Sequence, residues 1–343
     1  MHREILMKLA GGKNLNQTEC ENVLNEALAG TLDNAFLGAF LTAMKIKGES
    51  IDEIYAGAKV LRDNALHPDF DGHDMVDTCG TGGDGFGTYN VSTAAAFVCA
   101  AAGAGVAKHG NRSVSSKCGS FDVLEALGCY IGLDEKQTSE AVLKTNLGFM
   151  YAPLYHKAMK NVAHVRKVLG IRTIFNLLGP LSNPAGAGRQ LLGVFSQELM
   201  RPMAEVLAKL GVARALVVHG SDGMDEITIA GNTYVVEINN GLMREYEINP
   251  VMYGLKTAGA DSVLGGDAKQ NADIIINIFK GEEKGAKLSM LAMNTGAALY
   301  AVGISEDIES GVKKALETID SGLAYEKLKQ YIRVSNELGR GLE

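Results

Sequence analysis

A glycine-rich segment between a short β-like run and an apolar small-residue run constrains this chain more than any other feature. Residues 76–79 read as the end of a strand, five glycines lie within residues 80–87, and residues 94–102 have the composition of a buried helix. Because glycine has no Cβ, backbone N–H groups can converge on an anion there. Ser92 and Thr93 stand where the helix should be capped, so its positive end would face the same ligand. The segment predicts a loop that binds phosphate groups.

The rest of the chain repeats this change from strand to helix. The predicted strands are residues 76–79, 105–108, 191–195, 215–219 and 234–238. The predicted helices among and after them are residues 94–102, 122–127, 200–210, 267–279, 287–302, 306–319 and 325–337. Such alternation is typical of a mostly parallel sheet flanked by helices.

Residues 1 to about 66 contain no β-like run and are predicted to be entirely helical. Two capping boxes, Thr18 with Glu21 and Ser50 with Glu53, are expected to mark helix starts.

A polar break at residues 67–72 separates this region from the strands that follow. The predicted fold class is therefore α/β: a small N-terminal helical domain, residues 1–70, and a larger domain, residues 71–343, with a mostly parallel central sheet flanked by helices.

Composition excludes several classes of protein. With 343 residues, 46% of them hydrophobic, the chain can bury a full core. Its net charge of −7 disfavours a nucleic-acid or acidic-membrane partner, since both need a broad basic surface. Five widely spaced cysteines suit reduced thiols. Glu4 lies inside what would be the apolar region of a signal peptide, so none is expected. The apolar run 94–107 is shorter than the roughly 20 residues of a membrane span. We expect a cytoplasmic protein.

Residues 80–85 satisfy the spacing GxGxxG, so a dinucleotide has to be considered as the ligand. The expected helix does not begin at the third glycine, and no acidic residue lies between Asp84 and Asp122 to bind a ribose hydroxyl. No Lys-Ser or Lys-Thr pair follows the glycines, as a P-loop would require. Both nucleotide motifs are disfavoured.

A basic, serine-rich segment, KHGNRSVSSKCGS at residues 108–120, lies between a predicted strand and a helix that we expect Ser120 to cap. Lys108, Arg112 and Lys117 supply charge and the serines supply hydroxyl donors, so a diphosphate could be held there. Neighbouring cations should lower the pKa of His109, which favours a positioning role for it.

Two further segments carry charged residues. In HGSDGMDE, Asp225 and Glu226 follow a predicted strand, and adjacent carboxylates in a glycine loop favour Mg²⁺, although alone they could be solvated acids. Arg166 and Arg172 lie in VRKVLGIRTIFNLLGPLSNP, and the pattern does not decide which of them binds a ligand.

In this order, GTGGDG with NVST, KHGNRSVSSKCGS with FDVLEALG, VRKVLGIRTIFNLLGPLSNP and HGSDGMDE closely resemble the anthranilate phosphoribosyltransferase family. The resemblance implies a helical domain joined to an α/β domain, as in type II pyrimidine nucleoside phosphorylases. It also implies a homodimer paired through the helical domain, with help from helices near residues 155–180.

The implied reaction transfers the 5-phosphoribosyl group from phosphoribosyl diphosphate to the amine of anthranilate, in tryptophan biosynthesis. The implied catalytic residues are Lys108, His109, Asn111 and Arg166, and the implied ligands of two Mg²⁺ ions are Ser92, Asp225 and Glu226. Gly80, Asn111 and Arg166 would contact anthranilate. The full set of implied substrate-binding residues is Gly80, Gly83, Asp84, Thr88, Asn90, Val91, Ser92, Thr93, Lys108, His109, Gly110, Asn111, Arg112, Ser113, Val114, Ser115, Ser116, Ser120 and Arg166.

Two alternatives remain open at this point. A pyrimidine nucleoside phosphorylase-like enzyme would use inorganic phosphate and would not need the Asp225–Glu226 pair. A non-catalytic relative that binds nucleic acid would need a basic surface, which the net charge of −7 opposes.

Overall fold

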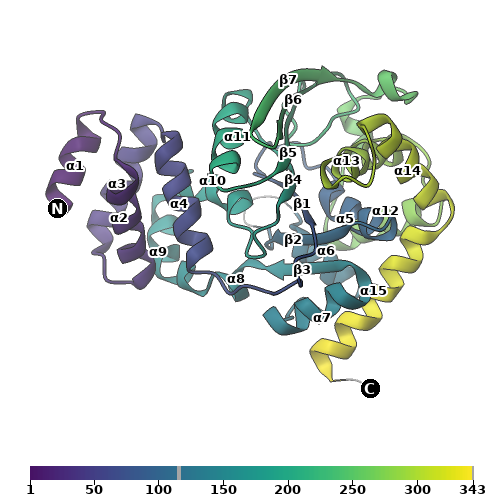
Figure 1. Cartoon of the computed structure of the whole chain (residues 1–343), viewed down its shortest axis with the longest axis horizontal. Helices are drawn as coiled ribbons and strands as arrows, with labels where there is room; N and C mark the ends of the chain where they lie inside the picture. The colour runs from purple at the N-terminus through teal and green to yellow at the C-terminus, as the bar shows by residue number, and fades with distance from the viewer. Residues whose placement is uncertain (114–116, 342–343) are drawn as a thin grey trace.

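The larger domain is built on one seven-stranded sheet with strand order β3-β2-β1-β4-β5-β6-β7 (Figure 1). The structure is a computed structural model that describes residues 1–113 and 117–341. The first five strands in this order are parallel, and β6 and β7 are antiparallel to their neighbours. The strands are β1 (Met75–Gly80), β2 (Gly105–Gly110), β3 (Leu147–Tyr151), β4 (Arg189–Gly193), β5 (Arg214–Gly220), β6 (Thr233–Asn239) and β7 (Leu242–Ile248).

All five predicted strands are confirmed, with ends that differ by two residues or fewer. The sequence prediction missed β3 and β7. Strand β7 is mostly exposed at the sheet edge, and charged residues occupy three of the seven positions of its sequence LMREYEI, which weakens the apolar signal of a strand. Its hairpin with β6 turns at Asn240 and Gly241, both with positive φ, which is a recognisable Asn-Gly hairpin signal.

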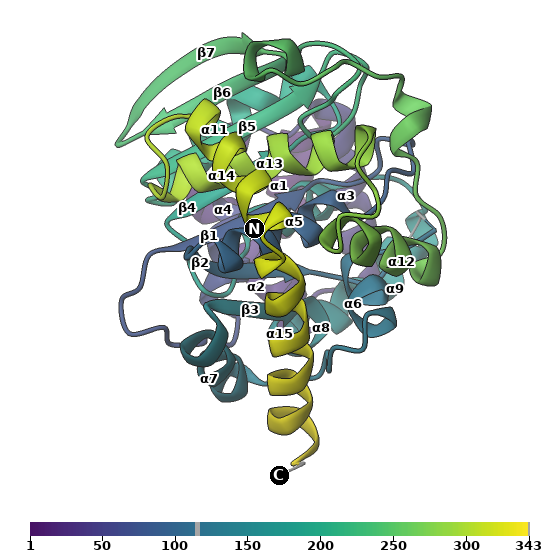
Figure 2. The same ribbon diagram turned by 90° about the vertical axis from the view of Figure 1, so that its right-hand side faces the viewer.

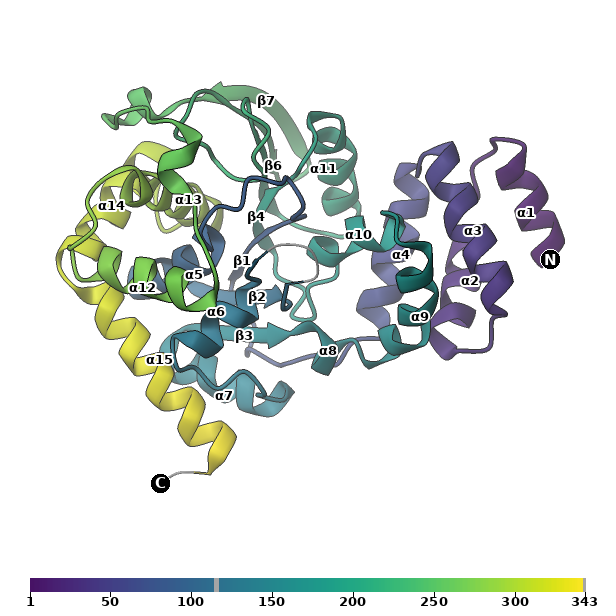
Figure 3. The same cartoon turned by 180° about the vertical axis from the view of Figure 1, so that it is seen from behind.

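Helices cover both faces of the sheet, as alternate residues of β5 show. Leu216 and Val218 belong to a core formed with the helices that follow the glycine segment and with the last four helices of the chain, whereas Ala215 and Val217 belong to a core on the opposite face. Figures 2 and 3 show these layers from the side and from behind. Most of the helical residues in the first core lie in α5 (Val91–Ala101), α12 (Ala268–Phe279), α13 (Ala286–Val302), α14 (Ile308–Asp320) and α15 (Leu323–Arg340).

The second core joins α11 (Met200–Lys209) to the helical domain. That domain begins with α1 (His2–Ala10), α2 (Gln17–Ala29), α3 (Asn34–Lys47) and α4 (Ile51–Asp63). Helices α9 (Lys160–Leu169) and α10 (Ile174–Leu178) come from much later in the chain, yet their residues Val162 and Ile174 are fully buried in the same core. They bring the arginine-bearing segment next to the carboxyl ends of the strands.

Shorter helices complete the larger domain. They are α6 (Ser120–Ala126), α7 (Glu135–Thr145) and α8 (Ala152–Tyr155). The predicted helices are confirmed, with ends that differ by three residues or fewer. All five cysteines are free thiols, and none of the described helices is long and apolar enough to cross a bilayer.

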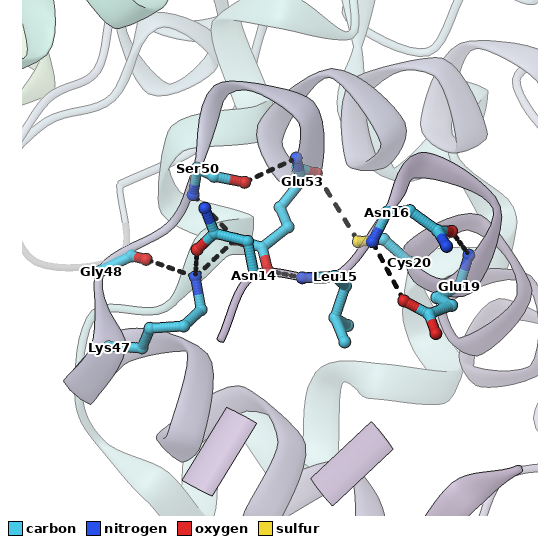
Figure 4. Close-up of polar contacts among 9 residues, drawn as sticks. All are labelled: Asn14, Leu15, Asn16, Glu19, Cys20, Lys47, Gly48, Ser50 and Glu53. Atoms are coloured by element: carbon cyan, nitrogen blue, oxygen red, sulfur yellow. Dashed lines mark hydrogen bonds and ion pairs between the residues drawn. The ribbon is translucent and has the colours of Figure 1, made fainter. Parts of the chain in front are cut away.

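One of the two predicted capping boxes is wrong. The Ser50–Glu53 box starts α4 as expected, but the N-cap of α2 is Asn16, whose side chain accepts a hydrogen bond from the Glu19 amide at 2.9 Å. The Glu19 carboxylate returns the bond to the Asn16 amide at 3.0 Å (Figure 4). Asparagine is as good an N-cap as serine or threonine, and it begins the helix two residues earlier.

A buried ion pair connects the end of α3 with the first turn of α4 (Figure 4). Glu53 has no exposed surface, and its carboxylate lies 2.7 Å from the Lys47 ammonium. The backbone amides of Leu15 and Ser50 each donate to this carboxylate at 2.8 Å. Lys47 also donates to Asn14 at 2.9 Å and to the Gly48 carbonyl at 2.7 Å. Glu53 therefore has a structural role.

Candidate active site

Two connected cavities lie where the parallel strands end. The first, the loop cavity, has a volume of about 390 Å³ and is lined by the glycine segment, the start of the basic segment and the acidic pair. The second, the interdomain cavity, has a volume of about 490 Å³ and lies between the helical domain and the sheet. Seven residues line both cavities and so mark the place where ligands in the two cavities would meet: Cys79, Gly80, Thr81, His109, Gly110, Asn111 and Asn176.

Two paired glycines let the acidic segment cross the ends of β1 and β4. Gly80 and Gly193 are partners in the parallel ladder. A Cβ on Gly80 would lie 2.7 Å from the Asp225 carboxylate, and a Cβ on Gly193 would run into the Asp225 backbone carbonyl. The Gly82 amide donates to Asp225 at 2.6 Å. Any larger residue at these two positions would push the carboxylates out of the cavity.

Three carboxylates meet in the loop cavity. Burial, and after it the charge of Asp84, raises the pKa of Asp225 to about 7. Burial and the charge of Asp225 likewise raise the pKa of Glu226 well above its ordinary value, although Lys108 and a hydrogen bond from the Ser92 amide oppose the shift. These carboxylates therefore carry more negative charge than the surrounding protein balances.

A hard divalent cation would relieve this charge. Carboxylate and hydroxyl oxygens are the ligands that Mg²⁺ prefers, and Ser92, Asp84, Asp225 and Glu226 all line the same cavity. Among the described residues, no three or more His, Cys, Asp or Glu side chains are grouped so as to hold a metal ion by themselves. Besides the acids, the Ser92 hydroxyl is available as a further oxygen donor at this cavity. The residues present fit Mg²⁺.

The start of α5 differs from the prediction. The N-cap is Asn90, so Ser92 and Thr93 are not capping residues but lie inside the first turn. In this position the Ser92 amide, one of the free donors of the helix start, bonds the Glu226 carboxylate. Lys108 donates to the Ser92 hydroxyl at 3.2 Å and also bonds the Thr78 carbonyl. The helix start, the lysine and the acid pair form one network.

The basic segment also differs from the prediction in part. Gly119 is the N-cap of α6 and Ser120 its first residue, because the Asp122 carboxylate bonds the amides of Gly119 and Ser113 at 2.9 Å. Arg112 pairs with two acids of α6, Asp122 at 3.1 Å and Glu125 at 2.9 Å. The predicted residues Val114, Ser115 and Ser116 lie outside the described residues.

His109 is held as a neutral ring. Burial, the neighbouring His156 and Lys108 lower its pKa to about 3, so burial contributes more than the cations that the sequence suggested. A Gly179 backbone group bonds one side of the ring, while the buried Nε2 atom has no hydrogen-bond partner among the described residues. A neutral imidazole at the junction of the two cavities can accept a hydrogen bond there.

The two arginines line different cavities. Arg166 lines the interdomain cavity beside the Phe175 ring, whose centroid is 5.3 Å from the guanidinium carbon, and burial lowers its pKa. Arg172 lines the loop cavity, where it bonds the Gly83 carbonyl and stacks on the Phe195 ring at 4.2 Å. Each cavity therefore has an arginine that can bind an anionic group.

Comparisons with known proteins identify the family. The helical bundle domain of the glycosyl transferase family matches residues 3–65, and the a/b domain of that family matches residues 72–325. Anthranilate phosphoribosyltransferase of Alkaliphilus metalliredigens is 48% identical over 338 residues, 98% of this chain and 99% of that protein. The chain belongs to the anthranilate phosphoribosyltransferase family.

Solved structures agree with this membership. The crystal structure of anthranilate phosphoribosyltransferase from Thermus thermophilus is 42% identical and has a TM-score of 0.91, covering 97% of this chain and 99% of that one. The Saccharomyces cerevisiae enzyme, 27% identical, has been solved with phosphoribosyl diphosphate and Mg, with a TM-score of 0.90 and 98% of both chains covered. It has also been solved with 4-fluoroanthranilate, at 26% identity, a TM-score of 0.89 and the same coverage. This family member is thus an enzyme that transfers a pentosyl group.

Most of the predicted site residues come together in this family member. Lys108, His109, Asn111 and the metal-ligand candidates Ser92, Asp225 and Glu226 all line the loop cavity. The other predicted residues that line it are Gly80, Gly83, Asp84, Thr88, Asn90, Gly110, Arg112, Ser113 and Ser120.

Two predicted binding residues are placed differently. The side chains of Val91 and Thr93 are fully buried in the helix core and line neither cavity. Their amides donate to the carbonyls of Tyr89 and Asn90. Helix α5 begins at Val91, three residues before the predicted start, so both residues lie within its buried first turn.

Several lining residues were missed or left undecided. Arg172, Asn176 and Phe195 line the loop cavity, and Asn176 also lines the interdomain cavity. The sequence offered Arg166 and Arg172 as a pair, and the structure gives each its own cavity. No local pattern marks Phe195, which reaches the site because β4 ends beside β1.

Proposed function

We propose that this chain transfers the 5-phosphoribosyl group of phosphoribosyl diphosphate to the amine of anthranilate, giving N-(5-phosphoribosyl)anthranilate and diphosphate. The observation that carries the proposal is the pair of connected cavities with different chemistry. One is lined by the glycine segment, Lys108 and acids. The other is lined by apolar side chains, with three basic side chains also at its wall: Met159, Phe175 and Pro180, and Lys157, Lys160 and Arg166. A polyphosphate suits the first and a small aromatic carboxylate the second.

The loop cavity would hold phosphoribosyl diphosphate with two Mg²⁺ ions. Ser92, Asp225 and Glu226 would hold the metal, which when bound neutralises charge that develops on the departing diphosphate. Lys108 and the amides of the glycine segment stabilise the same negative charge from the protein side. The donors are in place before the reaction begins, because Lys108 is anchored by Ser92 and Thr78.

The interdomain cavity would orient anthranilate. Arg166 would bind its carboxylate, and the apolar wall would hold its ring. The attacking amine is an aromatic amine, which is unprotonated near pH 7, so no strong base is needed to free its lone pair. His109 and Asn111 line both cavities, so they would lie near the point where the amine approaches the sugar carbon. Positioning would account for most of the rate enhancement.

We further propose that the chain forms a homodimer through its helical domain and acts in the cytoplasm. Exposed apolar side chains support the interface: Met7 on α1, Ile46 on α3 and Val168 on α9 are 65%, 82% and 70% exposed. Helix α3 contacts both α1 and α9, so the three helices are neighbours. Sedimentation velocity tests the dimer, and a single species of monomer mass at micromolar concentration would contradict it.

The fluorescence of anthranilate tests the reaction. It should fall when phosphoribosyl diphosphate and Mg²⁺ are both present, with little background because the chain has no tryptophan. Incubation with inorganic phosphate and a pyrimidine nucleoside should release no free base, whereas a nucleoside phosphorylase would release it. Persistent anthranilate fluorescence under these conditions would refute the proposed function.

A further inference from the structure

A buried asparagine of α12 contacts the loop cavity from behind. Asn271 is 2% exposed and lies 181 residues from Asn90, whose side-chain oxygen accepts a hydrogen bond from the Asn271 amide at 2.9 Å. Asn90 itself lines the loop cavity, whereas Asn271 lines neither cavity. Asn271 therefore acts on the ligand only through other residues.

The orientation of both amides follows from a backbone donor. The Gly266 N–H lies 2.7 Å from Oδ1 of Asn271, and an N–H group requires an acceptor. The Asn271 nitrogen must then face Asn90 and can only donate to it. Oδ1 of Asn90 is thereby occupied, and the Asn90 nitrogen is turned toward the Cys118 carbonyl at 3.4 Å. Asn90 lines the cavity, and with its oxygen held by Asn271, the group that it can offer to an anionic ligand is an N–H of its amide.

Asn271 also anchors the segment that supports the glycine loop. Residues 263–266 run antiparallel to residues 87–89, with a bridge between Thr88 and Leu264. The Gly265 amide donates to the Gly87 carbonyl at 2.9 Å, and the Tyr89 amide donates to the Val263 carbonyl at 3.2 Å. Gly265 is squeezed between Tyr89 and the Asn271 side chain, so a Cβ there would collide with both.

We propose that Asn271 is a positioning residue for phosphoribosyl diphosphate, which it serves by fixing the orientation of the Asn90 amide. This inference rests on the proposed function, because it takes the loop cavity as the site of that substrate. Asn271 touches neither substrate nor metal, and its effect passes through the hydrogen bond to Asn90.

Two substitutions separate orientation from simple loss of a contact. Asn271→Asp keeps an acceptor for Gly266 but places a second oxygen against the Asn90 oxygen, so the Asn90 amide should turn and present its oxygen to the phosphate. Asn271→Ala leaves Asn90 free to rotate and also removes the acceptor of the Gly266 N–H. The KM for phosphoribosyl diphosphate should rise by about tenfold or more with Asn271→Asp, as for loss of a hydrogen bond to a charged group, and by less with Asn271→Ala. The anthranilate KM should change little.

The Asn90→Ala background tests the route. If Asn271 acts through Asn90, neither Asn271 substitution changes the KM for phosphoribosyl diphosphate further in that background. An Asn271→Asp effect that persists there would show direct charge repulsion and overturn the inference. If Asn90→Ala by itself leaves this KM unchanged, the assignment of the loop cavity falls, and the inference with it.

A remote asparagine provides the control for stability. Asn336 of α15 donates two hydrogen bonds of 2.8 Å, to the carbonyls of Gly128 and Ile332, and lines neither cavity. Asn336→Ala should lower the thermal midpoint and leave both KM values unchanged. Calorimetric titration with phosphoribosyl diphosphate and Mg²⁺ should show the weakened binding of the Asn271 variants directly. Equal binding by Asn271→Asp and the unmodified enzyme would overturn the inference.

Discussion

The buried Lys47–Glu53 pair offers a prediction whose size can be worked from its contacts. The Glu53 carboxylate has no exposed surface and accepts three hydrogen bonds, one from Lys47 and two from backbone amides. Lys47→Met removes the cation of this pair and leaves a buried charge with two neutral donors. Breaking a buried pair in this way costs about 3–5 kcal/mol, because the remaining charge is neither solvated nor compensated.

An exposed pair in the same domain is the matched control. Lys59 and Asp63 on α4 form an i,i+4 ion pair with side chains 40% and 57% exposed. Lys59→Met should cost no more than about 0.5 kcal/mol, since solvent screens such pairs. The double change Lys47→Met with Glu53→Gln should recover part of the loss, because it removes the uncompensated charge while keeping a hydrogen-bond acceptor for a backbone amide.

Urea unfolding followed by far-ultraviolet circular dichroism measures these differences. The midpoint of the unfolding transition that involves the helical domain should move to a lower urea concentration for Lys47→Met and stay unchanged for Lys59→Met. The dependence of the unfolding free energy on urea concentration should be similar for both variants. High salt should not reduce the difference, because a buried pair is screened little. If the two single variants lose the same small amount of stability, the buried pair is not the stabilising contact that its geometry indicates.

The remaining predictions concern the two cavities. Arg166→Ala should raise the KM for anthranilate by about tenfold or more, and Arg172→Ala should raise the KM for phosphoribosyl diphosphate by a similar factor, because each loses a charged hydrogen-bond donor. Steady-state kinetics with each substrate varied in turn measures both values. If both variants affected the KM of the same substrate, the assignment would be contradicted. Asp225→Asn should stabilise the metal-free enzyme. The raised pKa of Asp225, about 7 against an ordinary 3.8, means that the folded state holds this proton more tightly than the unfolded state. Its contribution to stability is therefore lost as the pH rises from about 4 to about 7. In a chelator, the thermal midpoint of Asp225→Asn should exceed that of the parent protein, by an amount that grows as the pH rises over this range. Adding Mg²⁺ should raise the thermal midpoint of the variant less than that of the parent. Equal midpoints at pH 8 in the chelator would refute the argument.

Local sequence signals carried much of the fold and the site. The glycines of residues 80–87, the apolar run of α5 and the acidic pair after β5 are all short-range patterns, and each predicted a feature that the structure contains. Errors arose where two local signals compete. Asn16 capped α2 ahead of Thr18, and Asn90 preceded α5 ahead of Ser92, since any of these residue types can precede a helix.

Periodicity determined which segments become strands and helices, because side-chain alternation is a property of neighbouring residues. It carries no information on which distant segments become neighbours. The strand order placed β4 beside β1, and with it Gly193 beneath Asp225. The return of α9 and α10 into the helical core divided Arg166 and Arg172 between the cavities. Asn271 met Asn90 only because α12 folds back over the glycine segment. The sequence by itself determined the parts of a phosphate-binding site, and tertiary packing decided how those parts meet, because contacts over such separations depend on the sheet order and the cores of the whole chain.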